Sequence, residues 1–278
     1  KLSQLSKNFG KKITELENNI YQIVGQNFNI SSPKQLQEIF YEKMNLPVLK
    51  KTPKGQPSTS EDVMIELADH HQLPKLVLEY RNLSKLKNTY TDKLGETINN
   101  NTKRLHTSYN QTVTITGRLS SSNPNLQNIP IKTKDGRDIR KTFIPERGST
   151  IISADYSQIE LRVMAHLSQD KILLESFKNN EDIHSVTAKE IFSIPGQPSI
   201  EQRRVAKTIN FGLIYGISSF GLAKQLRIDN SEAKEFIDKY FLKYSGVKRF
   251  MSEIKKEAKN QGFVKTIAGR RIFLPNIT

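Results

Sequence analysis

Apolar residues recur at three- and four-residue steps through most of this chain, and that spacing restricts it to a mainly helical fold. Ile13, Leu16, Ile20 and Ile23 are spaced to lie on one face of a helix. A longer pattern of the same period covers residues 74–94, and similar patterns fill most of the second half of the chain. The sequence therefore predicts a fold built mainly from amphipathic helices.

Only short segments have the patterns that are typical of β-strands. Residues 112–116 alternate β-branched side chains, and residues 150–154 form a short apolar run. Residues 263–267 and 272–274, joined through Gly269, predict a small hairpin. We therefore predict an α+β fold that is mostly helical.

Capping signals predict where two of the early helices begin. Ser32 followed by Pro33 is typical of an N-cap and a first helical position. Ser58 and Glu61 have the spacing of a capping box. Residues 50–60 then form a polar loop between two helical segments.

Composition narrows the classes of partner. The 278 residues include no cysteine, which excludes a disulfide scaffold and a zinc-thiolate site. No apolar run approaches the roughly 18 residues that span a bilayer, so we expect no membrane association. Lys and Arg number 43 against 28 Asp and Glu, and residues 201–278 carry 16 basic and seven acidic side chains. This surplus favours nucleic acid or nucleotide phosphates as partners, although a lysine-rich proteome would produce the same excess.

Asp155 directly follows the apolar run of residues 150–154 and precedes a helical pattern that begins near Ile159. A carboxylate at the end of a strand suits Mg²⁺, because a hard cation prefers oxygen ligands held on a rigid element. The alternative is that Asp155 caps the following helix, which Asp often does. The residues alone leave both interpretations open.

The segment RRVAKTINFGLIYG combines cations and aromatic residues at helical spacing. Arg203, Lys207 and Phe211 share one stripe of the predicted helix, and Tyr215 lies at its edge. Two cations one turn apart can bind a polyphosphate, and an aromatic ring one turn further can lie against a base or sugar. An ordinary amphipathic helix with a basic edge is the alternative.

The same segment contains two glycines that a stable helix does not favour. Gly212 and Gly216 each cost roughly 1 kcal/mol relative to alanine in a helix interior. Close approach of a substrate to the backbone would explain their presence.

Two further groups carry donors and acceptors that can follow a sugar–phosphate backbone without reading sequence closely. One is the polar segment TGRLSSSNPNLQNIP, residues 116–130. The other is the stripe of Arg81, Lys85 and Thr89, spaced four apart on the long early helix. A polar surface loop and a solvated helix face are the respective alternatives. His184 could donate to a phosphate, but a lone histidine is more often structural.

Together these segments resemble the polymerase region of family A DNA polymerases, the bacterial DNA polymerase I type. DYSQIELR at residues 155–162 is similar to the first palm motif of that family, and RRVAKTINFGLIYG at 203–216 is similar to its fingers-helix motif. Residues 116–130 are similar to its primer–template-binding segment. The order and spacing of the three motifs agree, and the resemblance runs from near residue 10 to the last residue.

The resemblance implies template-directed DNA synthesis, in which a primer 3′-hydroxyl attacks the α-phosphate of a deoxynucleoside triphosphate and pyrophosphate leaves. It also implies a right-hand architecture with a thumb (residues 1–98), a partial palm with an antiparallel sheet (99–157) and fingers (158–278). The expected partners are primer–template DNA and deoxynucleoside triphosphates, and the expected cofactor is Mg²⁺, as two ions. We expect a monomer that serves replication and repair in the bacterial cytoplasm, at the nucleoid; the abundant Asn, Lys and Ile are equally compatible with an organelle.

The same resemblance gives each motif residue an expected role. Asp155 is expected to bind both Mg²⁺ ions with help from the backbone carbonyl of Tyr156, and Asp155 and Lys207 are the expected catalytic residues. Glu160 is expected to crowd a ribose 2′-hydroxyl and so to favour deoxynucleotides. The residues expected to bind the nucleotide are Arg203, Lys207, Phe211, Tyr215, Glu160, His184 and Gln158. The residues expected to bind DNA are Arg118, Asn125, Gln127, Asn128, Arg81, Lys85 and Thr89.

The sequence departs from the family pattern in one important respect. The second catalytic aspartate of the family follows a histidine in a His-Asp-Glu hairpin, and no His-Asp pair occurs in this chain. One carboxylate cannot position two cations about 4 Å apart. We therefore expect residues 1–278 to be a polymerase fragment that does not extend primers alone.

Two other functions share part of this pattern. A single-subunit RNA polymerase of the phage type has a similar helix and a strand-end aspartate, but Glu160 and residues 116–130 favour DNA synthesis. A non-catalytic nucleic-acid-binding module would also use a basic groove, but it would not need Asp155 or Lys207.

Overall fold

The computed structural model describes residues 1–277, which form two compact units that meet in the sequence at Ile151 and Ile152. This boundary lies inside the predicted palm, residues 99–157, and the division into thumb, palm and fingers stays a prediction. Thr278, the last residue of the predicted fingers, lies outside the described residues. None of the helices in residues 1–277 is long and apolar enough to cross a membrane.

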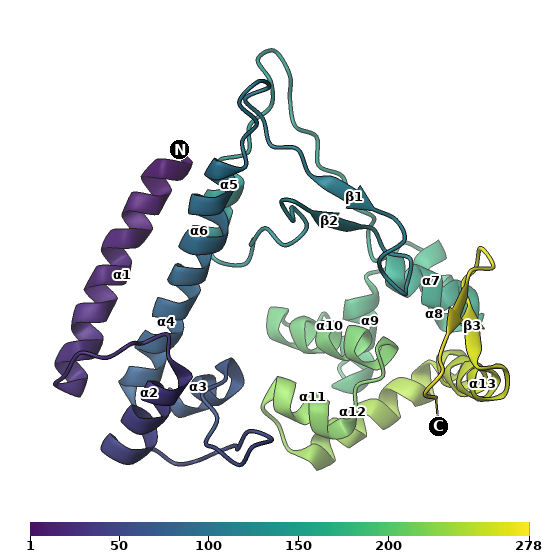
Figure 1. Ribbon diagram of the computed structural model, residues 1–278. Helices are drawn as coiled ribbons and strands as arrows, with labels where there is room; N and C mark the ends of the chain where they lie inside the picture. Colours follow the sequence, from purple (N-terminus) through teal and green to yellow (C-terminus); the bar gives the residue numbers. More distant parts are fainter. Residues whose placement is uncertain (278) are drawn as a thin grey trace. The chain divides into compact units, whose positions relative to one another are not determined.

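The first unit contains eight helical segments and one pair of strands among its described residues (Figure 1). In chain order they are α1 (Leu2–Val24), α2 (Pro33–Gln37), the π-helical η1 (Glu38–Lys43), α3 (Glu61–Leu67), α4 (Gln72–Leu86), the π-helical η2 (Lys87–Asp92), α5 (Lys93–Glu96), β1 (Ser108–Asn110), β2 (Ser120–Ser122) and α6 (Lys134–Arg140).

Helix α1 packs against α4, and both bury the apolar faces that their periodicity predicts. Leu16 is buried in one core cluster, with Ile13 packed against it, and Ile20 is buried in a second cluster, with Ile23 packed against that one. Burial of one such side chain contributes about 1.5–3 kcal/mol, so this shared face holds the two helices together. The helical segments from residue 72 to residue 96 follow one another without a break, which confirms the long helix predicted over residues 74–94.

One of the two predicted helix starts is confirmed and the other is wrong. The side chain of Ser32 accepts a hydrogen bond from the backbone N–H of Gln35 and Pro33 is the first helical residue, as predicted. Helix α3 instead begins after Ser60, whose side chain caps no backbone group.

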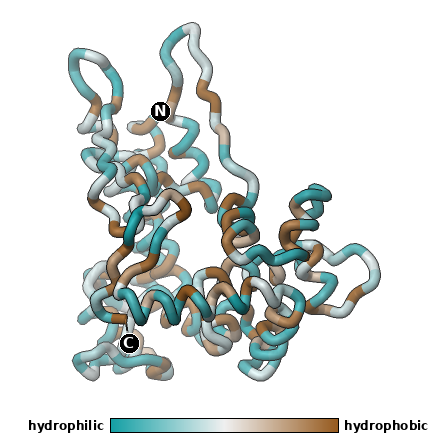
Figure 2. The backbone as a smooth tube through the Cα atoms, turned by 90° about the vertical axis from the view of Figure 1, so that its right-hand side faces the viewer, coloured by the Kyte–Doolittle hydropathy of each residue, from teal (hydrophilic) through white to brown (hydrophobic). Residues whose placement is uncertain are grey.

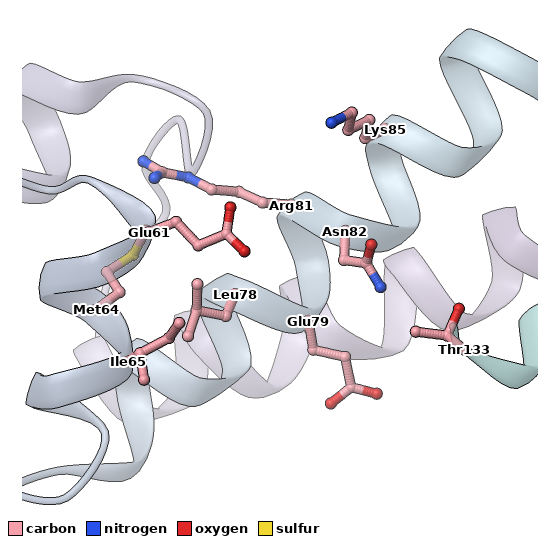
Figure 3. A pocket seen from close by; sticks show the side chains of 9 residues that line it. All are labelled: Glu61, Met64, Ile65, Leu78, Glu79, Arg81, Asn82, Lys85 and Thr133. Atoms are coloured by element: carbon pink, nitrogen blue, oxygen red, sulfur yellow. The ribbon is translucent and has the colours of Figure 1, made fainter. Parts of the chain in front are cut away.

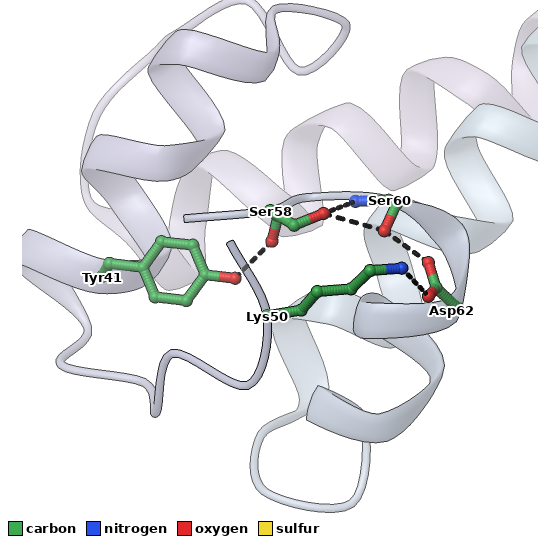
Figure 4. A network of polar contacts seen from close by, with 5 residues as sticks. All are labelled: Tyr41, Lys50, Ser58, Ser60 and Asp62. Carbon is green, nitrogen blue, oxygen red and sulfur yellow. Dashed lines mark hydrogen bonds and ion pairs between the residues drawn. The ribbon is translucent and has the colours of Figure 1, made fainter. Parts of the chain in front are cut away.

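Ser58 is part of a polar network on the loop before α3 rather than a cap (Figure 4). Its hydroxyl accepts from the backbone N–H of Ser60 at 3.2 Å, and its carbonyl accepts from the Tyr41 hydroxyl. Ser60 and Lys50 both donate to the Asp62 carboxylate, Lys50 at 2.8 Å. These donors, Lys50 first, hold the pKa of Asp62 well below its usual range. Side-chain contacts across the loop therefore replace the capping box that the spacing suggested.

The strand predicted over residues 112–116 is wrong. The antiparallel ladder pairs β1 with β2 in the register Ser108 to Ser122, and residues 112–116 lie in the loop between the two strands. Val113 and Ile115 are 69% and 79% exposed, so these alternating apolar side chains do not pack into a core. A β-strand needs a ladder partner as well as a suitable pattern, and the pairing here lies just outside the patterned residues.

The strand predicted over residues 150–154 is also absent. These residues have no regular secondary structure, and Ile152 is 88% exposed. No strand of the described chain pairs with them. Asp155 consequently follows an irregular segment rather than a strand.

The second unit contains seven helices and a hairpin among its described residues. They are α7 (Ile159–Ser168), α8 (Lys171–Lys178), α9 (Ile183–Ile191), α10 (Ile200–Ile214), α11 (Ser219–Leu226), α12 (Asn230–Lys243), α13 (Ser245–Gln261), β3 (Phe263–Lys265) and β4 (Arg271–Phe273). The hairpin predicted through Gly269 is confirmed, with Phe263 opposite Phe273.

Helix α9 lies near the centre of this unit and packs against both α10 and α12. Apolar and polar stretches alternate along the helices, the pattern of amphipathic elements around a core (Figure 2). Asp170 ties the start of α13 to the start of α8, because its carboxylate accepts from the backbone N–H groups of Ile172, Leu173 and Gly246. A Cβ at Gly246 would lie 2.8 Å from Asp170, so glycine is required at this junction.

Candidate nucleotide-binding and nucleic-acid-binding sites

Helix α10 carries three of the seven predicted nucleotide-binding residues, Arg203, Lys207 and Phe211, and its start is well capped. The Ser199 hydroxyl accepts from the backbone N–H of Gln202 at 3.1 Å, and the Gln202 side chain accepts from the backbone N–H of Ser199 at 2.8 Å. Ile209 and Leu213 face the core, while Lys207 is exposed on the other side. The helix therefore packs its apolar face into the core and leaves its charged face exposed.

Arg203, Lys207 and Phe211 lie one turn apart along α10, as the sequence predicts. Arg203 and Lys207 are exposed, and Phe211 is half-buried one turn further on. Tyr215 follows directly after the last residue of α10 and is 63% exposed. The stripe thus runs from two cations to two aromatic rings.

Arg203 is anchored to the start of α9 by a bidentate ion pair with Asp182. Its Nε and Nη2 atoms lie 2.6 and 3.2 Å from the two carboxylate oxygens. Asp182 also caps α9 and accepts from the Ser185 hydroxyl at 2.6 Å. Burial raises the pKa of Asp182, but the hydrogen bonds from Arg203 and Ser185 outweigh it and lower the pKa to about 2. Asp182 is therefore an anion at neutral pH, and the guanidinium keeps further N–H groups for another acceptor.

His184 lies beneath the charged face of α10. The residue is only 3% exposed, and its ring contacts the Phe211 ring at a centroid distance of 5.7 Å. Burial lowers the pKa of His184; Asp182 opposes that change, while Arg203 and Lys207 add to it, and the result is about 4. His184 is consequently neutral at pH 7.

A side-chain hydrogen bond joins α7 to the end of α10. The Tyr215 hydroxyl donates to a carboxylate oxygen of Glu160 at 2.5 Å. Gly216 follows in the left-handed region at φ 76°, which turns the chain sharply after Tyr215. Two residues predicted to bind the same nucleotide are therefore in direct contact.

The two glycines of this segment have structural explanations that the sequence did not reveal. A Cβ at Gly212 would lie 2.9 Å from a methyl group of Ile217, so Ile217 occupies the space that a side chain would need. Gly216 is required by its positive φ. Close packing and turn geometry account for both without a substrate.

Asp155 does not cap α7, so the alternative role considered for it is excluded. The helix begins after Gln158, which has the left-handed φ of 52°. Asp155 and Tyr156 precede it on an exposed segment, and the Asp155 carboxylate has no hydrogen-bond partner in residues 1–277. The Gln158 side-chain oxygen is buried and accepts no hydrogen bond from any described residue.

The donor set around Asp155 fits one edge of a metal site. A free carboxylate and the backbone carbonyl of Tyr156 are the oxygen ligands that Mg²⁺ prefers. Residues 1–277 contain no group of three or more acidic, histidine or cysteine side chains placed to share a cation. These residues can thus supply a first contact to a cation, not a complete coordination shell.

In the first unit, a groove of about 920 Å³ brings together two of the predicted DNA-binding groups. Lys85 and Thr89 line it from the long helix, and Asn125 and Asn128 line it from the polar segment. The Tyr90 hydroxyl donates to the carbonyl of Asn128 at 2.5 Å and so tethers that segment to the helix. The remaining lining residues are Tyr90, Lys93, Leu94, Thr97, Ser121, Ser122, Asn123 and Pro124.

Lys93 is a groove residue that sequence reasoning missed. It lies four residues beyond Thr89 and so continues the stripe of Arg81, Lys85 and Thr89. Continuing the four-residue spacing by one more position would have predicted Lys93 as a groove residue.

The other predicted DNA-binding residues lie outside this groove. Arg81 lines a separate hollow of about 530 Å³, and its side chain reaches past Glu61 (Figure 3). The Arg81 guanidinium donates to the carbonyl of Thr59 at 2.8 Å, and burial lowers its pKa. Gln127 donates to the carbonyl of Leu119 at 2.9 Å, and Arg118 is exposed on the preceding loop.

Comparison with known proteins shows the family of this chain. The model of the family described as DNA polymerase family A matches residues 1–278, and the chain belongs to that family. DNA polymerase I of Pseudomonas aeruginosa is 54% identical over 98% of this chain, and DNA polymerase I of Bacillus caldotenax is 48% identical over all of it. The chain covers 30% and 32% of those two proteins, so it spans about a third of the length of the curated relatives it matches.

A solved structure supports the fold directly. The POL domain of Pol1 from M. smegmatis, in complex with DNA primer-template and dNTP, superposes with a TM-score of 0.90 at 39% sequence identity. The match covers 99% of this chain and 48% of that one. The predicted fold class, a mostly helical α+β polymerase fold with small antiparallel sheets, is confirmed.

Proposed function

We propose that the complete protein carries out template-directed DNA synthesis and that α10 binds the incoming nucleotide. The primer 3′-hydroxyl gives its proton to water as its oxygen attacks the α-phosphorus. The bond from that phosphorus to the bridging oxygen of the β-phosphate breaks, and pyrophosphate leaves. The observation that carries this proposal is the stripe of Arg203, Lys207, Phe211 and Tyr215 on a polymerase-family helix. The relatives named DNA polymerase I support DNA rather than RNA as the product.

In this proposal each residue of the stripe meets a different part of the nucleotide. Arg203 and Lys207 bind the triphosphate, because charge-assisted hydrogen bonds to phosphate oxygens are strong and directional. Phe211 packs on the sugar and base, and Tyr215 lies at the templating position. Glu160 limits the space beside the sugar, and its bond to Tyr215 supports that placement. Gln158 and His184 are further nucleotide contacts.

Asp155 and the carbonyl of Tyr156 would hold Mg²⁺ in the complete enzyme, as two ions. When bound, divalent cations activate the 3′-hydroxyl and neutralise charge on the leaving oxygens. We propose that residues 1–278 alone do not extend primers, since the family arrangement needs a second carboxylate and the chain has no His-Asp pair. Robust Mg²⁺-dependent incorporation by residues 1–278 would contradict this.

The groove of the first unit is the proposed contact to primer–template DNA. Lys85 and Thr89 face the same space as Asn125 and Asn128, which supports contacts to one stretch of backbone. Arg81, Arg118 and Gln127 are proposed as further DNA contacts. We also propose that the enzyme acts as a monomer at the bacterial nucleoid; the bacterial source of the relatives supports only the bacterial part of this proposal.

The test is incorporation of dATP against ATP by the complete protein on a primed template. We expect the wild type to incorporate dATP far more efficiently than ATP. The ratio of the two efficiencies should be smaller in Glu160→Ala. Tyr215→Phe is the matched control, because it removes the hydrogen bond to Glu160 and leaves the carboxylate in place. Equal use of the two nucleotides by the wild type would indicate an RNA polymerase. Duplex binding without any incorporation would indicate a binding module.

A further inference from the structure

Four buried polar side chains form a continuous hydrogen-bonded chain through the second unit. The Tyr244 hydroxyl lies 3.0 Å from the Thr187 hydroxyl, which lies 3.1 Å from Oδ1 of Asn210. Nδ2 of Asn210 lies 3.0 Å from Nδ1 of His184. None of the four is more than 3% exposed. The chain ends at the histidine beneath the cationic face of α10.

The direction of these bonds follows from counting hydrogens. Burial raises the pKa of Tyr244 to about 12 despite its bond to Thr187, so the Tyr244 hydroxyl keeps its hydrogen. In residues 1–277, neither hydroxyl has a side-chain partner outside this chain. If Tyr244 donates to Thr187 and Thr187 donates to Oδ1 of Asn210, every hydroxyl hydrogen is used. The opposite amide orientation would leave one buried hydroxyl hydrogen without an acceptor, which costs about 1–3 kcal/mol.

This direction determines the protonation of the histidine ring. The Asn210 amide presents N–H to Nδ1 of His184, so Nδ1 must accept and a neutral ring carries its hydrogen on Nε2. We propose that Asn210 is a positioning residue that holds His184 as the Nε2–H tautomer, which donates to a phosphate of the incoming nucleotide. The proposal rests on the proposed function for its ligand and on the buried chain for its geometry.

The surroundings of the ring favour a neutral donor. Burial is the largest cause of the low pKa of His184; Asp182 opposes it, whereas Arg203 and Lys207 act with it, so the imidazolium form is disfavoured at neutral pH. The opposite tautomer would turn a lone pair toward an anion, whereas Nε2–H adds a third donor beside the two cations. The Phe211 ring, 5.7 Å away, supports the ring orientation.

The tautomer can be measured without any activity. In residues 1–278 labelled with ¹⁵N-histidine, we expect His184 to show a protonated Nε2 and an unprotonated Nδ1 at pH 7, with His184→Gln providing the assignment. A hydrogen on Nδ1 in the wild type would overturn the proposal. Apart from His184→Gln, which serves only to assign the signal, this measurement needs no variant of the network, so it decides the point even if the Asn210 and Thr187 variants unfold.

Asn210→Asp is the most informative variant, because the side chain is nearly isosteric but offers only acceptors. We expect Nδ1 of His184 to become protonated. Thr187→Val tests the next link, since without the hydroxyl the Asn210 amide can take either orientation and a mixture of tautomers should appear. The matched control is Thr208→Val in α10, the helix of Asn210. Within residues 1–277 the Thr208 hydroxyl donates to the carbonyl of Arg204 and takes no part in the buried chain.

The functional consequence is measured in the complete polymerase. We expect Asn210→Asp to raise KM for deoxynucleoside triphosphates about tenfold, the size of one lost hydrogen bond to a charged group, with primer–template affinity unchanged. Thr208→Val should stay within about twofold of the wild type. An unchanged KM in Asn210→Asp, with Nδ1 of His184 protonated and Nε2 unprotonated, would overturn the proposed role. If both ring nitrogens are protonated, the Nε2–H donor is kept, and a raised KM would overturn it instead. A wild-type protein that incorporates no nucleotide would instead contradict the proposed function, while the NMR result still decides the tautomer.

Discussion

The two units use their polar candidate residues in different ways. In the first unit, Arg81 and Gln127 donate to backbone carbonyls, and Tyr90 tethers the polar segment in the same manner. In the second unit, Arg203 pairs with Asp182 and Tyr215 with Glu160, side chain to side chain. The first arrangement holds loops in place, whereas the second joins α7, α9 and α10 through the candidate site itself.

This difference separates two kinds of expected effect. Removal of a donor to a backbone carbonyl loosens a loop and should act on binding of extended DNA. Removal of one partner from an interhelical pair changes the face that meets the nucleotide, and should act on nucleotide affinity or on the chemical step. The predictions below compare candidate residues of the two units by the readout that each should change.

The largest effect is expected at Asp155. In the complete protein, Asp155→Ala should lower polymerase activity by about a thousandfold or more, because a metal contact stabilises the transition state by several kcal/mol. Salt-sensitive binding to duplex DNA should persist. Primer extension and filter binding give the two readouts. Asp229→Ala, an exposed aspartate whose side chain caps no backbone group, is the control.

A smaller effect is expected at Lys207, and it should differ in kind from that at Lys85. Lys207→Ala should reduce kcat/KM for deoxynucleotides by about ten- to a hundredfold, the range for loss of a charge-assisted hydrogen bond. Lys85→Ala in the first unit should instead weaken primer–template binding and reduce its salt slope by about one, with KM for nucleotides unchanged. If both variants changed nucleotide kinetics and primer–template binding in the same way, the distinction between the two units would be contradicted.

The pKa of His184 makes the stability of the second unit depend on pH. Its folded-state value of about 4 lies below the ordinary value near 6.5, so between these values the unfolded chain binds a proton that the folded chain does not. Stability should therefore fall as pH decreases, by about 2 kcal/mol between pH 7 and pH 5 from this group alone. Urea unfolding should show this loss in the wild type but not in His184→Gln. Equal losses in both proteins would mean that His184 is not buried as a neutral ring.

The smallest effects compare glycines in the two units. Gly212→Ala should destabilise the protein by about 1 kcal/mol, because overpacking against Ile217 outweighs the gain in helix propensity. Gly95→Ala in α5 meets no atom within 4 Å and should stabilise by up to about 1 kcal/mol. Thermal unfolding should give a lower Tm for Gly212→Ala and a higher Tm for Gly95→Ala. A stabilising Gly212→Ala would show that Ile217 moves aside freely.

Local signals in the sequence predicted the helices, because an amphipathic period describes one element and the core it faces. The buried Leu16 and Ile20, the Ser32 cap and the stripe on α10 all followed from spacing. Lys93 was within reach of the same reasoning.

Features that depend on a distant partner were not predictable in this way. Residues 112–116 and 150–154 have strand-like patterns, but a strand exists only where another strand pairs with it. Asn210 looked like any polar residue within a motif, and its contacts exist only because α9 lies against α10. The reason for Gly212 was likewise hidden until Ile217 was seen beside it.

The most direct test is a crystal structure of the complete protein with primer–template DNA, a deoxynucleoside triphosphate and Mg²⁺. We expect triphosphate oxygens within about 3 Å of the Lys207 amine and the Arg203 guanidinium, and a metal ion bound to the Asp155 carboxylate. A triphosphate bound away from α10, with no metal on Asp155, would contradict the assignment of this face as the nucleotide site.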